Sequence, residues 1–502
     1  MQLLLALDAG TTSVKAVLFD EAGHTLGCSV QEYRLLTPAP DRVELPAETY
    51  WAACRRGIRE LFDRSGLSPA DVVAVSVSSQ GETIIPIDRS GQPLCNAIVW
   101  LDNRPAAEAA ELARAVDLDA FYGVTGLPEV IPTWPACKIL WFRQQAPEVF
   151  ARAHKFLLLE DYLLYRLTGQ FVTEGSVSTS TGYFDIRSGT WWPLMLDLIG
   201  ITAGRLPELR PSGSVVGPVS AKAAGETGLP LHTRVVTGAM DQVAGAIGAG
   251  NIAPGVITET TGTTLALAAT LPRLTYDPQK RLPIYYHALP GTYILLPYCQ
   301  TAGIVLKWFR DEFGQEDLVE AQRTGQDAYD LLAARAADVP AGAEGLLMLP
   351  HLSGSTSPNF NPAARGVFFG ISLKHGKGHF VRAIMEAVAF MLRENLDVLR
   401  ELGIELSEVR ALGGGAKSPL WLQIMADVNQ LPVRTMQCEE AAALGVSILA
   451  ATAVGLYSDI AAACAGMVGI RATIEPRPEA QAVYDRAYER YLALYRCLRP
   501  LW

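Results

Sequence analysis

The sequence predicts an α/β protein whose two similar halves face each other across a central cleft. An apolar strand, Leu3 to Leu7, runs into a Thr/Gly turn and out into a second apolar strand, Val14 to Phe19. The pattern returns at residues 256–268, where VITETTGTTLALA again places two apolar runs around a Thr/Gly turn. At 502 residues the chain is also longer than one hydrophobic core normally supports, so two domains are expected.

The first turn has the chemistry of a phosphate site. Gly10 permits a tight backbone bend, and Thr11 and Thr12 add hydroxyl donors beside free backbone N–H groups. Asp8 ends the strand, and its carboxylate suits Mg²⁺, bound directly or through water. An ordinary hairpin explains either turn alone. The repetition favours a pair of turns that hold the phosphates of one nucleotide from both sides.

Composition restricts the class of protein. Hydrophobic residues make up 49% and charged residues 19%, which is typical of a globular enzyme. The net charge of −10 disfavours nucleic acid as a partner, because phosphate backbones attract basic surfaces. The eight cysteines contain no CxxC pair, and no signal peptide is visible, so we expect reduced thiols in a cytoplasmic protein. The apolar run 441–456 is too short to span a membrane, which favours a buried helix and no membrane partner.

Hydrophobic periodicity predicts the elements in order. Residues 1–35 form three strands around two turns, and 47–64 form a helix with Tyr50, Cys54, Ile58 and Leu61 on one stripe. Further strands are expected at 71–78, 84–88, 97–100, 235–240, 256–268 (a hairpin), 345–350, 366–371 and 409–412. Further helices are expected at 105–117, 136–170, 243–250, 301–308, 315–335, 379–402, 419–428, 440–456 and 477–497, with a loop at 173–183.

Polar residues follow several of these strands. Gln80 and Glu82 follow the strand expected at 71–78, and Asp102 and Arg104 follow the strand expected at 97–100. Ligands gather at the carboxyl ends of strands in open α/β sheets, so the set predicts a pocket that binds hydroxyl groups. Salt bridges among Glu82, Asp102 and Arg104 are the alternative interpretation.

Asp241 stands where a strand enters a small-residue helix. A carboxylate there serves either as a helix N-cap or as a general base that accepts a hydroxyl proton during phosphoryl transfer. Position alone leaves both roles open. The Gly413–Gly415 run, between a strand and a helix, lets backbone approach a flat base or a ribose.

Together these motifs resemble the FGGY carbohydrate kinases, of the sugar kinase, Hsp70 and actin superfamily, over roughly residues 3–455. The family's defined positions are matched by Asp8–Thr12, Gly238–Asp241, Gly262–Thr264, Gly366–Ile371 with His379, Phe380, Ala383 and Glu386, and Gly413–Ala416 continuing to Trp421 and Ala426–Asp427. The resemblance implies two actin-like (ribonuclease H-like) domains, residues 1–244 for sugar and 245–502 for adenine nucleotide, in an often dimeric enzyme.

The resemblance also implies roles for individual residues, with ATP and Mg²⁺ as cofactors. Asp8 would hold Mg²⁺, and Asp241 would be the base on the sugar hydroxyl. Substrate hydroxyls would be bound by Gln80, Gly81, Glu82, Asp102 and Gln242. The nucleotide would be held by Thr11, Thr12, Lys15, Gly262, Thr263, Gly303, Lys307, Gly414 and Gly415.

The substrate is read from residues 80–83. Xylulose kinases typically have Met-His-Gly here, whereas Gln80-Gly81-Glu82-Thr83 is nearer the Gln-Arg-Glu-Thr of glycerol kinases, with Gly81 in place of the Arg. Loss of that side chain predicts room for a longer substrate, a pentulose or related sugar or polyol, with a xylulose-like sugar first. The alternatives are a glycerol- or erythritol-type polyol kinase, a kinase of a signalling metabolite such as a linear furanone-derived diol, and a non-catalytic nucleotide-gated binding protein.

Overall fold

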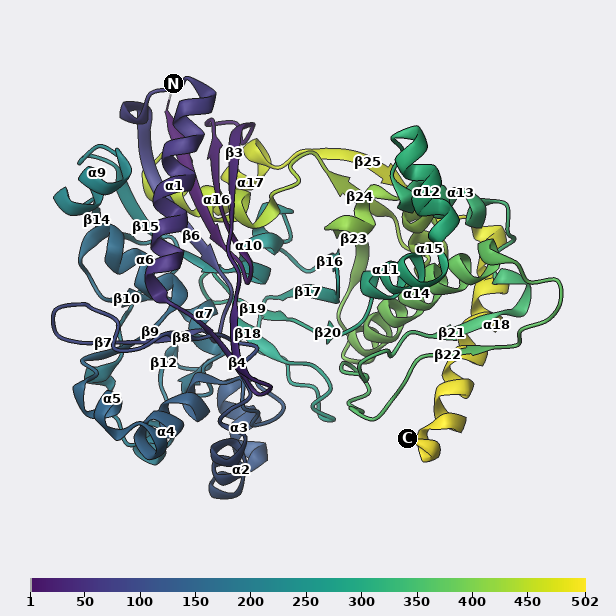
Figure 1. Ribbon diagram of the computed structural model, residues 1–502, viewed down its shortest axis with the longest axis horizontal. Coiled ribbons are helices and arrows are strands. Elements are labelled where there is room, and N and C mark those ends of the chain that lie inside the picture. The colour runs from purple at the N-terminus through teal and green to yellow at the C-terminus, as the bar shows by residue number, and fades with distance from the viewer. Residues whose placement is uncertain (1) are drawn as a thin grey trace. The chain divides into compact units, whose positions relative to one another are not determined.

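The computed structural model describes residues 2–502, which form two compact units, each described by itself (Figure 1). The first unit comprises the chain up to Ile252 together with Leu271–Ile294 and Glu440–Val468. The second unit comprises Ala253–Thr270, Leu295–Glu439 and Gly469–Trp502. The units therefore interleave along the chain, and the predicted division at residue 244 stays a prediction.

The first unit is built on a mixed sheet of six strands. β1 pairs in parallel with β6, and β6 with β15, while β1, β2 and β3 form the antiparallel meander that the sequence predicted. In spatial order the strands are β14 (Val215–Pro218), β15 (Arg234–Met240), β6 (Val72–Ser79), β1 (Leu3–Ala9), β2 (Ser13–Phe19) and β3 (Thr25–Glu32). Three parallel strands thus end at the same edge of this sheet and carry Asp8, Gln80 and Asp241 there.

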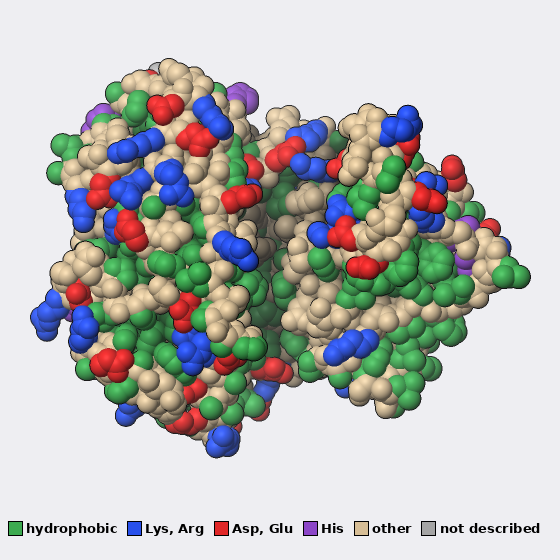
Figure 2. Space-filling model, viewed as in Figure 1, with side chains coloured by type: hydrophobic (Ala, Val, Ile, Leu, Met, Phe, Trp, Pro, Cys, Tyr) green, Lys and Arg blue, Asp and Glu red, His purple; other side chains and the backbone are tan. Residues whose placement is uncertain are grey.

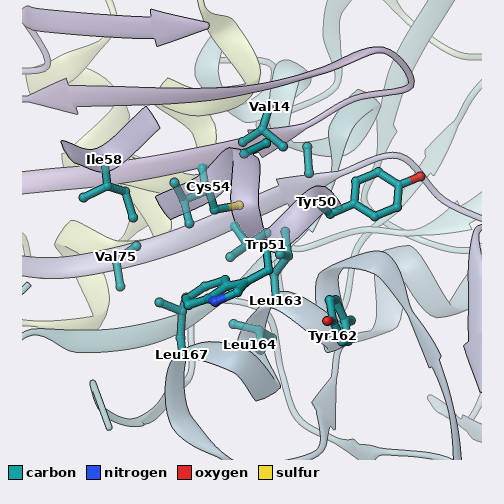
Figure 3. Close-up of a cluster of buried hydrophobic side chains, with 14 of the residues drawn as sticks. Val14, Tyr50, Trp51, Cys54, Ile58, Val75, Tyr162, Leu163, Leu164 and Leu167 are labelled. Carbon is teal, nitrogen blue, oxygen red and sulfur yellow. The ribbon is translucent and has the colours of Figure 1, made fainter. Parts of the chain in front are cut away.

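Two helices cover this sheet with apolar side chains. α1 (Ala47–Ser65) packs against β2 and β3, and α6 (Leu159–Thr168) packs against β6 and β15. Their buried residues pack in one cluster, and in Figure 3 the ring of Trp51 on α1 lies beside Leu164 and Leu167 of α6. Each fully buried large apolar side chain stabilises the fold by roughly 1.5–3 kcal/mol.

A second helix pair in this unit depends on glycine. α10 (Asp241–Gly248) and α16 (Ala441–Ala453) approach so closely that a Cβ on Gly248 would lie 1.8 Å from the carbonyl oxygen of Ala441. A Cβ on Gly445 would likewise lie 1.9 Å from the oxygen of Ala244. The buried helix predicted for the apolar run 441–456 is confirmed, and it packs on the helix that begins at Asp241.

The rest of the first unit consists of a small sheet, short strand pairs and peripheral helices. The small sheet contains, in order, β4 (Leu36–Ala39), β5 (Arg42–Leu45), β8 (Ala97–Ile98), β7 (Ile84–Ile87) and β9 (Lys155–Leu158). Short strands are β10 (Val172–Thr173) with β13 (Glu208–Leu209), β11 (Phe184–Asp185) with β12 (Thr190–Trp191), and β18 (Ile284–Tyr286) with β19 (Tyr293–Leu295). The helices are α2 (Ala106–Ala115), α3 (Leu118–Thr125), α4 (Pro135–Gln145), α5 (Pro147–Arg152), α7 (Gly175–Thr179), α8 (Pro193–Ile199), α9 (Ala221–Thr227) and α17 (Ile460–Met467), with 3₁₀ turns η1 (Pro69–Asp71) and η2 (Ala203–Arg205).

The second unit repeats the plan of a mixed sheet covered by helices. β16 pairs antiparallel with β17 and in parallel with β23, as β1 does with β2 and β6. Its strands are β16 (Gly255–Thr261), β17 (Leu265–Leu271), β20 (Tyr298–Cys299), β23 (Leu406–Leu412), β24 (Val433–Met436) and β25 (Ile470–Ile474), with the separate pair β21 (Leu347–Leu349) and β22 (Val367–Phe369). Its helices are α11 (Gly303–Phe313), α12 (Gln315–Thr324), α13 (Ala328–Ala337), α14 (Lys377–Glu401), α15 (Pro419–Asn429) and α18 (Pro478–Leu498), with 3₁₀ turns η3 (Ala343–Gly345), η4 (Gly414–Lys417) and η5 (Arg499–Leu501).

Three predicted elements differ from the structure. Residues 136–170, predicted as one helix, form α4, α5 and α6, with strand β9 between α5 and α6. Residues 315–335, also predicted as one helix, form α12 and α13, because Gly325 ends α12 with a φ of +73°. The loop expected at 173–183 contains the buried helix α7.

Two further properties concern the surface. Acidic and basic side chains are interspersed over the face shown in Figure 2. Among residues 2–502, none of the helices has the length and apolar character needed to cross a bilayer.

Candidate functional site

The turn that carries Asp241 is shaped by a break in the strand ladder. β15 pairs with β6, and the register shifts between Val236 and Ala239, as in a β-bulge. A Cβ on Gly238 would lie 1.7 Å from the carbonyl oxygen of Val77, so only glycine fits at the bulge. The Gly238 N–H instead donates to Glu160 Oε1 at 2.9 Å. The pairing resumes at Ala239 and Met240, so the bulge lies within the strand just before Asp241.

Buried polar side chains then hold the turn in place. The Met240 N–H donates to Ser176 Oγ at 3.0 Å, and this hydroxyl donates to Glu174 Oε1 at 2.7 Å. Glu174 also accepts the backbone N–H groups of Ser176 and Val177 at the start of α7. The short helix where the sequence predicted a loop is thus part of the support for Asp241.

The carboxylate of Asp241 has the properties of a general base. Burial raises its pKa to about 7, and the negative charges of Asp8 and Glu82 act in the same direction. Met240, and not Asp241, is the N-cap residue of α10, and Asp241 Oδ1 accepts the N–H of the next residue, Gln242, at 2.7 Å. A carboxylate that titrates near neutral pH transfers protons most effectively under physiological conditions. Between the two roles that the sequence left open, this geometry favours the base.

Asp8 lies near the end of β1, beside the turn that leads to β2. Burial raises the pKa of Asp8, against which the charge of Lys15 acts. Lys15 Nζ lies 2.5 Å from Oε2 of Glu440, which directly precedes α16. Thr11 Oγ1 donates to Gln80 Oε1 at 3.0 Å and accepts from Trp100 Nε1 at 2.9 Å, whereas Thr12 is exposed. One predicted phosphate residue, Thr11, is therefore in direct contact with one predicted sugar residue, Gln80.

The predicted substrate residues differ in what they contact. Gln80 is buried, and its amide donates to the Tyr50 hydroxyl at 3.3 Å. Glu82 is partly exposed and has a φ of +57°, which is unusual for a residue with a side chain. Asp102 is fully buried, and its oxygens accept from Arg104 and from the Val43 N–H at 2.6–3.0 Å. Its carboxylate thus forms the salt bridge that the sequence left as an alternative.

Gly81 has close neighbours, and the room expected beside it is filled. A Cβ there would lie 2.8 Å from Ser180 Oγ and 3.5 Å from Met240 Sδ. Ser180 also hydrogen-bonds the Glu82 side chain, which opposes the rise in the pKa of Glu82 that burial causes. The expectation of free space at Gly81 is wrong, because a hydroxyl donor occupies it.

Sequence reasoning missed three residues of this region. Ser180 lies in the segment that was predicted as a loop. Tyr285 on β18 is buried, and its pKa is raised by burial and by the charges of Glu82 and Asp241, which places it near both. Lys138 on α4 is fully buried. A lone lysine in the apolar run ACKILWF was the available signal for Lys138, whereas only the tertiary fold brings Tyr285 here.

The second unit contains a cavity of about 300 Å³. Its lining includes all six nucleotide residues predicted in this half of the chain, namely Gly262, Thr263, Gly303, Lys307, Gly414 and Gly415. Asp327, Tyr329, Asp330 and Trp421 also line it, the first three because the chain turns between α12 and α13. The size is in the range of small-molecule sites.

Glycines allow the backbone segments around this cavity to meet. A Cβ on Gly303 would lie 2.3 Å from the Gly262 oxygen, and one on Gly415 would lie 2.7 Å from the Thr261 Cβ. The N–H groups of Ala302 and Ile304 donate to the Thr263 oxygen at 3.0 and 3.2 Å. The hairpin turn, the start of α11 and the Gly run are thereby fixed around one space. Lys307 Nζ, at its rim, pairs with Asp311 at 2.6 Å.

Comparison with known proteins covers nearly the whole chain. Residues 3–248 match the N-terminal domain of the FGGY family of carbohydrate kinases, and residues 257–454 match its C-terminal domain. An autoinducer-2 kinase of Enterobacter sp. (strain 638) is 33% identical, with 99% of this chain and 94% of the relative covered. A xylulose kinase of Staphylococcus epidermidis is 29% identical over 100% and 98% of the two chains. The crystal structure of xylulose kinase from Rhodospirillum rubrum has a TM-score of 0.90 at 32% identity, over 100% and 99%.

Proposed function

Because the chain belongs to the FGGY family of carbohydrate kinases, whose members transfer phosphate from ATP to an alcohol, we propose that it phosphorylates a pentulose or a related sugar or polyol. A xylulose-like sugar is the first candidate. The observation that carries this proposal is the carboxylate of Asp241, with a pKa of about 7, beside Glu82 and Asp8 at one edge of a sheet. Full-length similarity to xylulose kinases supports the choice of sugar.

In the proposed reaction a sugar hydroxyl lies against Asp241, which accepts its proton as the oxygen attacks the γ-phosphate. Glu82, Gln80 and Gln242 would orient the remaining hydroxyls. The cavity of the second unit would hold ATP. Asp8 suits the single protein ligand of a nucleotide-bound Mg²⁺, since Mg²⁺ keeps most of its coordination to phosphates and water. The negative charges of Asp8 and Glu82 lie near Asp241, and a bound cation would offset them.

The pH profile should report the titration of Asp241. Only the ionised carboxylate accepts a proton, and the raised pKa means that the group is mostly protonated below about pH 7. We therefore expect kcat/KM for the sugar to rise roughly tenfold per pH unit up to about pH 7 and then to level off. Initial rates from pH 5.5 to 8.5 check this. A profile that is flat between pH 5.5 and 7.5 would contradict the assignment.

Gly81→Ala should weaken the use of sugar without affecting the nucleotide. The new methyl group would lie 2.8 Å from Ser180 Oγ and would displace the hydroxyl that contacts Glu82. Misplacement on this scale lowers kcat/KM for the sugar by about 10- to 100-fold. Gly225→Ala in α9, where a Cβ meets nothing within 4 Å, is the matched control. Equal changes in the KM of sugar and ATP would argue against a sugar pocket here.

A substrate panel tests the identity of the acceptor. ADP formation is measured with glycerol, erythritol, D- and L-xylulose, ribulose, gluconate and autoinducer-2. The proposal expects the highest kcat/KM with a xylulose, and a preference for glycerol would refute it. Autoinducer-2 is the second candidate, favoured by the 33% identity to autoinducer-2 kinase, and a clear preference for it would replace the pentulose.

A further inference from the structure

Lys138 is a lysine with no solvent exposure in the first unit. It lies on α4, and its ammonium donates to the carbonyl oxygens of Glu82, at 2.9 Å, and of Val99, at 3.1 Å. A buried ammonium without partners is strongly disfavoured, so these contacts are needed where it lies. The reaction described above assigns no role to this side chain.

The two carbonyl groups belong to the two loops that carry the predicted sugar residues. Glu82 lies in the turn between β6 and β7, and Val99 directly follows β8. The Val99 oxygen also accepts the N–H of Asp102 at 3.0 Å. Lys138 therefore connects the Glu82 turn to the Asp102 turn, and its contacts fix both turns relative to α4.

The backbone at Glu82 needs such support. Its φ of +57° is in the left-handed region, which residues with a Cβ rarely adopt. The Thr83 N–H donates to the Gly81 oxygen at 2.6 Å, so the turn is tight as well. The Lys138 contact at the Glu82 carbonyl holds the residue in this conformation and so directs its side chain.

The charge of Lys138 acts on the Glu82 carboxylate as well as on the backbone. The charged and titratable groups that act on it are Glu82, Asp102, Cys137 and Arg104. Burial lowers the pKa of Lys138 and raises that of Glu82, and each charge opposes the shift of the other. An ammonium at this position thus favours an ionised Glu82.

We propose that Lys138 is a positioning residue for the sugar, which holds the Glu82 turn in its left-handed conformation and supplies the positive charge that keeps the Glu82 carboxylate ready to accept substrate hydroxyls. This inference rests on the proposed sugar kinase function. It assigns Lys138 to sugar binding through Glu82, and to neither ATP binding nor proton transfer.

The test compares Lys138→Met with Lys155→Met in the full-length protein. Lys155, on β9, also donates to two carbonyl oxygens, those of Gly204 at 2.8 Å and Leu206 at 2.7 Å, and it pairs with the end of β7 remote from Glu82. For Lys138→Met we expect the sugar KM to rise at least about tenfold and the ATP KM to stay within about twofold. The acid limb of the sugar kcat/KM profile should also move to higher pH, because loss of the ammonium raises the pKa of Glu82, whose ionised form binds the sugar before Asp241 accepts the proton. Lys155→Met should change none of these quantities.

A purely structural role predicts a different result. Both variants would then lower the thermal midpoint, and Lys138→Met would leave the ratio of the two KM values and the pH profile unchanged. That outcome would overturn the inference.

A thermal double-mutant cycle makes the test independent of the substrate. The midpoint loss of Lys138→Met combined with Glu82→Gln should be smaller than the sum of the single losses by about 3 °C, because the double variant removes both members of an interacting pair of charges. Additive losses would refute the Lys138–Glu82 link. If the wild type phosphorylates no sugar of the panel, the proposed function fails, whereas the cycle still decides whether Lys138 supports Glu82.

Discussion

Replacing Asp241 by Asn is expected to lower the turnover of the sugar roughly 10³-fold. The amide keeps the size of the side chain and an oxygen that accepts the Gln242 N–H, which is 2.7 Å from Oδ1 in the wild type. It cannot accept the hydroxyl proton. Steady-state ADP formation at saturating sugar measures the loss, and ATP affinity, measured by equilibrium titration, should change less than about twofold.

The control for this variant separates proton transfer from a helix-end effect. Asp459 caps α17 in the same unit and accepts the Ala462 N–H at 2.8 Å. Asp459→Asn keeps one oxygen at a helix start, as Asp241→Asn does, and should leave turnover unchanged. Asp241→Asn with at least half of the wild-type turnover would show that another group accepts the proton.

Gly303→Ala should raise the KM for ATP by roughly tenfold or more, with little change in the sugar KM. The added Cβ would lie 2.3 Å from the Gly262 oxygen, so the start of α11 and the hairpin turn must move apart. Both segments line the cavity of the second unit, and small displacements of binding groups are costly. Measurements of both KM values check this, with Gly225→Ala as the control.

The opposite pattern would be informative. If Gly303→Ala raised the sugar KM and left that of ATP unchanged, the cavity would not be the nucleotide site. A loss of thermal stability alone, with both KM values unchanged, would likewise show that the cavity is not the nucleotide site.

Much of the fold could be predicted because it depends on local patterns. The meander of β1, β2 and β3 follows apolar runs that are interrupted by turn residues, and the helix predicted at 379–402 is observed as α14. The four stripe residues predicted for α1, namely Tyr50, Cys54, Ile58 and Leu61, are all buried. In the second half, the six predicted nucleotide residues line one cavity, because strand–glycine–helix patterns place backbone turns at the same sheet edge.

What could not be predicted depends on tertiary contacts. A Ser/Thr/Gly-rich segment is typical of a loop, but residues 175–179 form a buried helix because Glu174 caps it and Ser176 contacts the Asp241 turn. The segments Leu271–Ile294 and Glu440–Val468 join the first unit although they are remote in sequence. Likewise, nothing in the spacing indicates that Ser180 fills the place beside Gly81.

The most direct measurement is ³¹P NMR of the products from ATP and D-xylulose with the wild type and with Asp241→Asn. The account predicts one new phosphate monoester per ADP with the wild type and almost none with the variant over the same time. Inorganic phosphate in place of a sugar ester, or equal ester formation by both proteins, would contradict a sugar kinase in which Asp241 accepts the proton.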